Sequence, residues 1–376
     1  MHKDETVTVG SGRGIRGVPL LVPAGAFLLG ATLLLLQADL EDLPPLVELA
    51  LSVGIIGLVF WTVFVALGHA EAVAHRLGEP YGTLVLTMAV TAIEVSVIVS
   101  VMLHGTPNPT IARESVFSTV MIITSGVVGV CLVLGGLRHR RQEYNPLGTG
   151  ALLSVVIALA VLTLVLPNFT LAAGPGHFSP IQLIFVSTIC VLLYGAFVYA
   201  QMTRQRDDFL DAVAPPAEEH AAPKQRLALS LCMLLISLFG IVMLAEHIAA
   251  ALEGGLEALN VGQSDAIVGA FIATLVLLPE AVSAIRAATH NELQRSLNVA
   301  LGSVCATIGL TVPAVAVVSL IIGEPLTLGL GPGDSVLLML ALAVSIVSFS
   351  QGRTTVLTGL VHLVVFVAYL LLIAVP

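Results

Sequence analysis

Charge is what this sequence lacks most. Charged residues make up only 10% of the 376 residues, whereas apolar residues make up 57%. A soluble domain is typically about 25% charged and about 45–50% apolar. A composition so poor in charge excludes an ordinary soluble domain, and it indicates a chain that is solvated mainly by lipid.

Cysteine and catalytic motifs are also scarce. All four cysteines fall in apolar runs without a C-x-x-C pair or a disulfide framework, and we interpret them as small core residues: Cys131, Cys190, Cys232 and Cys305. No H-E-x-x-H or G-x-S-x-G motif is present. Most of the ten histidines lie near the ends of apolar runs, with His247 and His362 as exceptions. An intramembrane enzyme is therefore a minor alternative, and we predict a protein that is not an enzyme and has no cofactor.

Long apolar runs are what the sequence has instead. Each is long enough to cross a bilayer as a helix of about 20 residues. No signal-peptide cleavage pattern is convincing at the N-terminus, so we expect the first run to be a retained span. We predict an all-α polytopic membrane protein with eleven transmembrane helices, at 19–37, 45–67, 82–103, 115–136, 147–166, 180–201, 227–249, 265–287, 296–321, 334–350 and 355–375.

Basic residues follow the predicted spans in alternation. With this span count, every Lys and Arg except Arg113 falls in loops on one side of the membrane. In membrane proteins the cytoplasmic loops carry the excess of Lys and Arg. We therefore predict a multi-pass inner-membrane protein whose N-terminus is cytoplasmic and whose C-terminus is extracytoplasmic.

The opposite face is acidic. Ordinary loop polarity is one explanation, and a field that attracts cations is the other. The acids of this face are Asp39, Glu41, Asp42, Glu114, Glu253, Glu257, Asp265, Glu324 and Asp334.

The two halves of the chain resemble each other. Each half has an Ala-Glu pair, Gly-containing turns, an apolar helix with a central Glu and then a Ser-bearing helix. Five spans per copy force the copies into opposite orientations, as in secondary transporters that bind substrate at the midplane. We predict an N-terminal segment with the first helix (1–44), two inverted five-helix repeats (45–202 and 227–376) and a cytoplasmic linker (203–226).

Two carboxylates stand near the centres of predicted spans, Glu94 in 82–103 and Glu280 in 265–287. A carboxylate at a helix centre costs about 2.5–3.5 kcal/mol on insertion scales. Two such residues point to a function, the alternative being protonated acids that are hydrogen-bonded inside the bundle. Pro279 precedes Glu280, and proline removes a backbone N–H and leaves helix carbonyls available as ligands.

Hydroxyl and amide oxygens accompany these acids. Thr87 and Thr91 precede Glu94 on its helix face, and Ser303, Thr307 and Thr311 recur at helical spacing. Such residues are often packing surfaces, but with carboxylates they suit a hard cation such as Ca²⁺. The predicted cation ligands are Glu94, Glu280, Thr87, Thr91, Ser303, Asn298 and Ser118.

Two buried acids also suggest a proton mechanism. Burial and mutual repulsion favour protonated carboxyls in an empty site, and a bound cation reverses that preference. Protons and cations then compete for the same oxygens. We predict a cation/proton antiporter in which Glu94 and Glu280 bind the cation and carry the protons. A cation channel and a membrane scaffold are minor alternatives, no nucleic-acid partner is expected, and a homo-oligomer stays open.

Two motifs resemble the paired repeats of the calcium/cation antiporter superfamily, most closely the bacterial ChaA-type Ca²⁺/H⁺ antiporters: "GEPYGTLVLTMAVTAIEV" and "LVLLPEAVSAIRAATHNELQRSLNVALGSVCATIGLTVP". The resemblance implies eleven-span antiporters with inverted five-helix repeats. It places the essential repeat acids on Glu94 and Glu280 and the serine of the Gly-Ser pair on Ser303. The acids of spans two and seven fall on Glu71 and Glu246, where we expect peripheral contacts with approaching cations.

The chain departs from one branch of that superfamily. Vacuolar exchangers carry Gly-Asn shortly before each central Glu, whereas the corresponding stretches here read "AVTAIE" and "VLLPE". ChaA-type proteins also resemble Na⁺/H⁺ and K⁺/H⁺ exchangers. Export of Ca²⁺ in exchange for H⁺ is therefore the first expectation, and Na⁺ and K⁺ remain open as cargo.

Overall fold

Helices make up nearly all of the structure. The computed structural model describes residues 21–36, 45–77, 81–104, 109–210, 227–258 and 264–375. Eight helices in this part are uninterrupted: α1 (Leu21–Leu36), α2 (Pro45–Leu77), α3 (Tyr81–His104), α7 (Pro180–Met202), α8 (Leu227–Ala258), α9 (Ser264–Thr289), α12 (Pro332–Ser348) and α13 (Val356–Ala374).

Three further helices change their winding along their length, through π-helical turns that are often found at functional sites. The first consists of α4 (Ile111–Met121), the π turn η2 (Ile122–Val127) and α5 (Val128–His139). The second consists of α6 (Pro146–Ala160), the π turn η3 (Val161–Val165) and the 3₁₀ turn η4 (Leu166–Phe169). The third consists of α10 (Leu293–Ala306), the π turn η6 (Thr307–Thr311) and α11 (Val312–Ile322).

Each predicted span coincides with one of these helical segments, although α2 and α8 extend well beyond the predicted ends. Seven helices of the described residues are long and apolar enough to cross a membrane: Ala50–Ala70, Ile111–His139, Pro146–Phe169, Pro180–Met202, Ser264–Thr289, Leu293–Ile322 and Val356–Ala374. Four other helices contain shorter apolar stretches. The all-helical membrane class is thus established, while eleven crossings and the inverted-repeat layout remain predictions.

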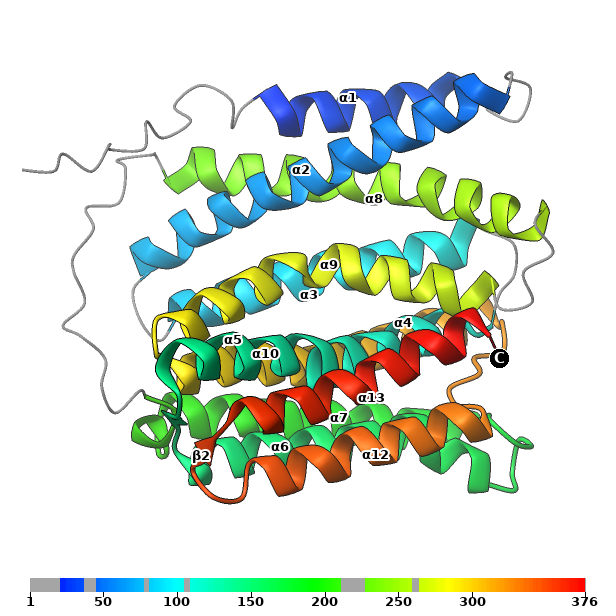
Figure 1. Cartoon of the computed structure of the whole chain (residues 1–376). Helices are drawn as coiled ribbons and strands as arrows, with labels where there is room; N and C mark the ends of the chain where they lie inside the picture. Colours follow the sequence, from blue (N-terminus) through cyan, green and yellow to red (C-terminus); the bar gives the residue numbers. More distant parts are fainter. Residues whose placement is uncertain are drawn as a thin grey trace, which may run out of the picture.

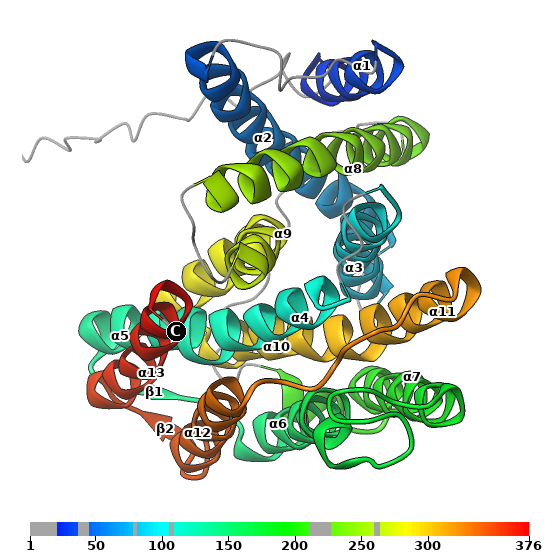
Figure 2. The ribbon, with the colours of Figure 1, turned by 90° about the vertical axis from the view of Figure 1, so that its right-hand side faces the viewer.

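The helices lie side by side along roughly one direction (Figure 1). Helices α1, α2 and α8 form a group at one side, and α6, α7 and α12 form a group at the other (Figure 2). Helices α3, α9, α4 and α10 lie between the groups. This central layer contains both predicted carboxylates, Glu94 on α3 and Glu280 on α9.

Close packing holds α4 against α9. A Cβ atom added to Gly269 of α9 would lie 2.6 Å from the Cβ of Glu114 and 2.8 Å from its carbonyl carbon. Glycine therefore allows two backbones to approach each other, which is a common basis of helix association in membranes. The approach sets the η2 turn beside α9, with which it is in contact.

Short contacts between loops close both ends of the bundle. At one end, strands β1 (Gln142–Glu143) and β2 (Arg353–Thr354) pair antiparallel and join the α5–α6 turn to the α12–α13 turn. At the other end, a β-bridge joins His177 to Thr327. The turns of the two halves are thereby tied together at each end.

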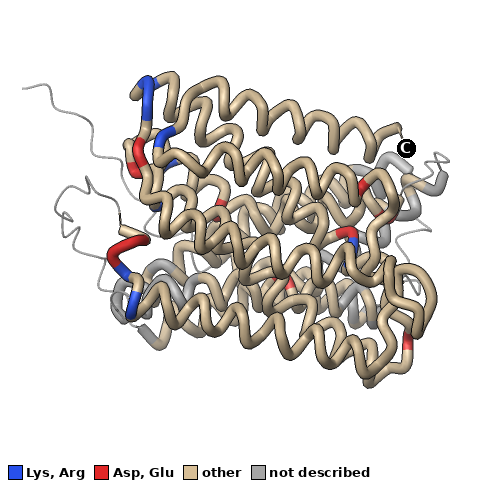
Figure 3. The backbone as a smooth tube through the Cα atoms, turned by 90° about the horizontal axis from the view of Figure 1, so that it is seen from below, with Lys and Arg blue, Asp and Glu red and all other residues tan. Residues whose placement is uncertain are grey.

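Basic residues gather at one end of the described bundle (Figure 3). A single basic segment lies toward the opposite end, and the C-terminus is also at that opposite end. This distribution agrees with the alternation of basic loops in the sequence. The orientation of the chain in a membrane stays a prediction.

Candidate cation site

Glu94 is held at one oxygen and free at the other. Its side chain lies in α3 and is only 3% exposed. Thr307, the first residue of η6, donates its hydroxyl to Glu94 Oε2 at 2.6 Å, whereas Oε1 has no hydrogen-bond partner. Thr311, at the end of the same π turn, lies near enough to interact with this carboxyl, but its hydroxyl does not meet hydrogen-bond geometry. One carboxylate oxygen and one hydroxyl are thus left available to a ligand.

Glu280 lies in α9 directly after Pro279, which is inside the helix. Its Oε2 atom is buried and has no hydrogen-bond partner. Glu94 and Glu280 are near enough for their charges to interact. The structure therefore brings together the two acids that the sequence singled out, from helices that are far apart in the chain.

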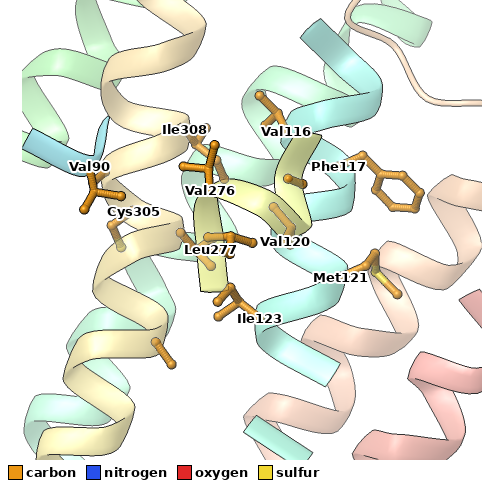
Figure 4. Packing of buried hydrophobic residues seen from close by; sticks show 14 of the residues in the cluster. Val90, Val116, Phe117, Val120, Met121, Ile123, Val276, Leu277, Cys305 and Ile308 are labelled. Atoms are coloured by element: carbon orange, nitrogen blue, oxygen red, sulfur yellow. The ribbon is translucent and has the colours of Figure 1, made fainter. Parts of the chain in front are cut away.

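Buried apolar side chains flank the two acids along their own helices and along the helix of Thr307. Val90 of α3, Val276 and Leu277 of α9, and Cys305 and Ile308 beside Thr307 are all buried, and Figure 4 shows them in one packed region. A charged carboxylate in such surroundings is costly unless it is paired or protonated. The pair therefore favours either a bound cation or a bound proton.

The other predicted ligands are placed differently. Thr91 is buried in α3, the helix of Glu94, and Thr87 in the same helix is partly exposed. Ser303 is buried in α10, four residues before Thr307. Ser118 accepts a hydrogen bond from the Tyr369 hydroxyl at 2.7 Å.

Asn298 is also bonded within the protein. Its Nδ2 donates to the carbonyl of Phe209 at 2.6 Å, and its Oδ1 accepts from Gln294 Nε2 at 2.9 Å. The side chains of Glu71 and Glu246 lie outside the described part of the chain. All of these residues stay predictions as cation ligands.

Thr307 is the contact that sequence reasoning missed. It belongs to a polar stripe with Ser303 and Thr311, but it is not among the cation ligands that the sequence predicts. Its spacing of four residues from Ser303 puts both on one helix face, and that signal could have identified it. The π turn that aims its hydroxyl at Glu94 is not visible in the sequence.

A second polar cluster lies at the end of the bundle away from the gathered basic residues. Arg113 donates to the carboxylate of Glu114 and, at 3.0 Å, to the carbonyl of Gly329. A cavity of about 420 Å³ is lined by Arg113, Glu114, Asp265 and Asp334, among other residues. Among the described residues, no group of three or more His, Cys, Asp or Glu side chains could hold a metal ion. The cavity is thus lined by three acids, Glu114, Asp265 and Asp334, and by one basic side chain, Arg113.

Comparison with known proteins identifies the relatives of this chain. Residues 47–203 and 229–375 match the family described as sodium/calcium exchanger protein. The sodium-potassium/proton antiporter ChaA of Escherichia coli is 34% identical over 350 residues, which cover 92% of this chain and 94% of that relative.

Solved structures share the fold. YfkE, at 18% identity, has a TM-score of 0.69 and covers 96% of this chain and 100% of its own. The H⁺/Ca²⁺ exchanger CAX, at 15% identity, has a TM-score of 0.68 and covers 94% of this chain and 87% of its own. At this level of identity the likeness establishes the fold of the bundle and nothing about its cargo.

Proposed function

Because the chain belongs to the sodium/calcium exchanger protein family, we propose that it exchanges a metal cation for protons across a membrane. Glu94 and Glu280 bind the cation and carry the protons. The exchange is secondary transport by alternating access, with the pair near the midplane between two inverted five-helix repeats. The acids of spans two and seven, Glu71 and Glu246, attract the cation on its way.

One observation carries this proposal: Glu94 Oε1 and Glu280 Oε2 are buried oxygens without hydrogen-bond partners, on two carboxyls that lie near enough for their charges to interact. In a dry bundle, a pair of this kind is stable when protonated or when it holds a cation. One occupant excludes the other, so binding of a cation releases protons. This mutual exclusion is the elementary step of an antiporter.

The first candidate cargo is Ca²⁺, exported in exchange for H⁺. Two carboxylates neutralise a divalent ion, and the hydroxyls of Thr307 and Thr311 with the carbonyls near Pro279 supply the neutral oxygens that Ca²⁺ prefers. Calcium is also named, together with sodium, in the description of the family to which the chain belongs.

Sodium and potassium form the second candidate cargo. The observation in their favour is the Escherichia coli relative, a sodium-potassium/proton antiporter that is similar to this chain over nearly its whole length. A monovalent ion needs only one of the two acids to be ionised. Exchange would then use Glu94 and Glu280 with a single negative charge between them.

Purified protein in liposomes tests the function and the cargo together. We expect addition of the transported cation to drive protons across the membrane, read with a pH-sensitive dye, with Ca²⁺, Na⁺ and K⁺ compared in parallel. A scaffold would move no protons with any cation. A channel would pass the cation without coupled proton movement. Either result would contradict the proposal.

The proposed orientation has its own test. We expect a reporter fused after Pro376 to lie outside the cytoplasm and one inserted near Pro215 to lie inside it, in the inner membrane of a bacterial host. Finding both reporters in the same compartment would contradict the eleven-span arrangement.

A further inference from the structure

Two buried hydroxyls of α4 have no hydrogen-bond partner. Ser115 and Thr119 are each 0% exposed, and neither Ser115 Oγ nor Thr119 Oγ1 is hydrogen-bonded. Buried hydroxyls inside helices commonly donate to the carbonyl four residues earlier, as Thr124 and Ser125 do in the η2 turn that follows α4. A buried polar group without a partner costs free energy, and it is explained by a functional role or by a water molecule that it binds.

The two hydroxyls begin beside the cavity that Glu114, Asp265 and Asp334 line, here called the acidic cavity. Ser115 directly follows Glu114 in α4. Thr119 comes four residues later, so both hydroxyls lie on one face of the helix, one turn apart. Since α4 runs from the cavity toward η2, the two hydroxyls lead from the cavity into the bundle.

The helix of Glu280 runs beside these hydroxyls. Helices α4 and α9 both start at the acidic cavity, because Glu114 and Asp265 stand in their first turns. The two backbones meet at Gly269, where an added Cβ would lie 2.9 Å from the backbone nitrogen of Ser115. Glu280 is eleven residues beyond Gly269 in α9, on the same face and about 16 Å along the axis. The contact between α4 and α9 therefore leads from the cavity toward the carboxylate pair.

A third hydroxyl of this kind lies beside the pair. Thr311 of η6 is 0% exposed, and its Oγ1 meets hydrogen-bond geometry with no group. The η6 turn contacts α4, and Thr311 lies near enough to the Glu94 carboxyl to interact with it. Helix α10 follows α9 by a short turn and runs back toward the cavity. Thr311 is thus about one turn nearer to the cavity than Thr307, the residue that donates to Glu94.

The close approach at Gly269 limits what can pass between α4 and α9. A Cβ atom there would lie 2.6 Å from the Cβ of Glu114, so a metal ion with its ligands has no room between the two backbones. A proton needs no such room, because a hydroxyl can accept a proton on one lone pair while it releases its own. Hydroxyls one helical turn apart are separated by about 5–6 Å, a gap that one water molecule bridges.

We propose that Ser115, Thr119 and Thr311, with water molecules between them, form a proton path from the acidic cavity to Glu94 and Glu280, separate from the route of the cation. A hydronium ion in the cavity gives up one proton, and each hydroxyl passes one proton on and stays neutral. The transferred proton ends on a carboxylate oxygen as the cation leaves. The proposal rests on the exchange function and names the residues that deliver the proton.

Three threonine substitutions form a matched test. Thr119→Val removes the hydroxyl and fills its space with a methyl group, whereas Thr119→Ser keeps the hydroxyl. Thr163→Val is the control, because Thr163 in η3 is equally buried but donates to the Leu159 carbonyl at 2.8 Å. In liposomes, we expect cation-driven proton movement to be about tenfold slower in Thr119→Val. The half-saturating cation concentration should not change, and Thr119→Ser and Thr163→Val should behave as the unchanged protein.

Exchange of a cation for the same cation distinguishes a proton path from general damage, because it consumes no protons. Liposomes are loaded with radioactive Ca²⁺ or Na⁺ and placed in a solution of the same unlabelled ion. Release of the label should be as fast in Thr119→Val as in the unchanged protein. A substitution that disturbs the cation site or the rearrangement of the helices would slow this reaction as well.

Three results would overturn the proposed path. Normal proton movement in Thr119→Val would show that its hydroxyl carries no protons. Equal slowing of proton movement and label release would assign Thr119 to packing. Slowing in Thr119→Ser as large as in Thr119→Val would show that the hydroxyl is not what matters. If the unchanged protein and Thr163→Val couple no cation to protons, the exchange function itself fails, and the path fails with it.

Discussion

Glu94 and Glu280, the two acids of the proposed site, differ in their surroundings. Thr307 in η6 donates its hydroxyl to Glu94. The π turn η2, which contacts the helix of Glu280, has hydroxyls at Thr124 and Ser125. Both donate to backbone carbonyls one turn earlier in their own helix instead.

The π turn η2 is also hydrogen-bonded to α13. His362, buried in α13, is hydrogen-bonded through Nδ1 to the Thr124 carbonyl at 2.8 Å and through Nε2 to the Ser348 hydroxyl at 3.0 Å. The polar groups of η2 thus stabilise the contact with α13, while η6 serves the carboxylate. Local hydrogen bonding thus holds the Glu94 carboxyl in place and leaves the Glu280 carboxyl freer.

The largest effect is expected when Glu94 or Glu280 is replaced. We expect Glu94→Gln and Glu280→Gln each to abolish coupled fluxes, because the amide keeps the shape but cannot titrate. Asp at either position should leave weaker exchange, since the charge is kept but withdrawn by one methylene. Cation-driven acidification in vesicles, at matched expression, is the measurement.

The opposite result is equally informative. A purely structural acid would tolerate Gln, because a protonated Glu and a Gln can each donate a hydrogen bond in a dry bundle. Well-expressed Glu94→Gln protein that still exchanges would refute the shared mechanism. Survival of only the Glu280 variant would mean that the two acids have different roles.

The two π turns can be compared directly with threonine-to-valine changes. Thr307→Val removes the donor to Glu94 at nearly constant shape, and a hydrogen bond to a charged group is worth about 1.5–3 kcal/mol. We expect apparent cation affinity to fall at least about tenfold. Thr124→Val, which removes only a bond within the helix, should change affinity by less than about twofold. Equal effects of the two substitutions would show that η6 and η2 do not differ in their influence on cation binding.

Glu71 and Glu246, the acids of spans two and seven, can be compared with the central pair in the same way. Glu71→Gln and Glu246→Gln are expected to weaken apparent cation affinity about threefold while exchange continues, because we place them outside the central pair where charge attracts the cation. Titration of proton flux against cation concentration checks this. Complete loss of exchange in either variant at normal expression would assign that acid to the central site.

Helix positions and the two acids were predictable because apolar runs and a lone carboxylate are local signals. The position of Glu94 and Glu280 within such apolar runs was enough to single them out. The partner of Glu94 was not predictable: Ser303 and Thr307 are both hydroxyl residues on one stripe, and only tertiary packing decides which hydroxyl reaches the carboxyl. The role of Asn298 was not predictable for the same reason. An amide in a polar stripe can bind a cation, or it can donate a hydrogen bond to a backbone carbonyl such as that of Phe209.

The smallest expected effect concerns the acidic cavity, which lies at the first turns of the helix that carries Glu280. Asp334 lines the cavity, whereas Glu324 is exposed in the loop before α12. Glu280 is 15 residues beyond Asp265 in α9, about 22 Å along the helix, and salt screens charges over about 10 Å at 0.1 M. We therefore expect Asp334→Asn to raise the half-saturating cation concentration from that side only about twofold, and more at low ionic strength. Glu324→Gln removes the same charge outside the cavity and should have a smaller effect. If both variants behave alike, the cavity has no influence beyond the general negative charge of that face, and the difference between Glu94 and Glu280 is confined to their immediate hydrogen bonds.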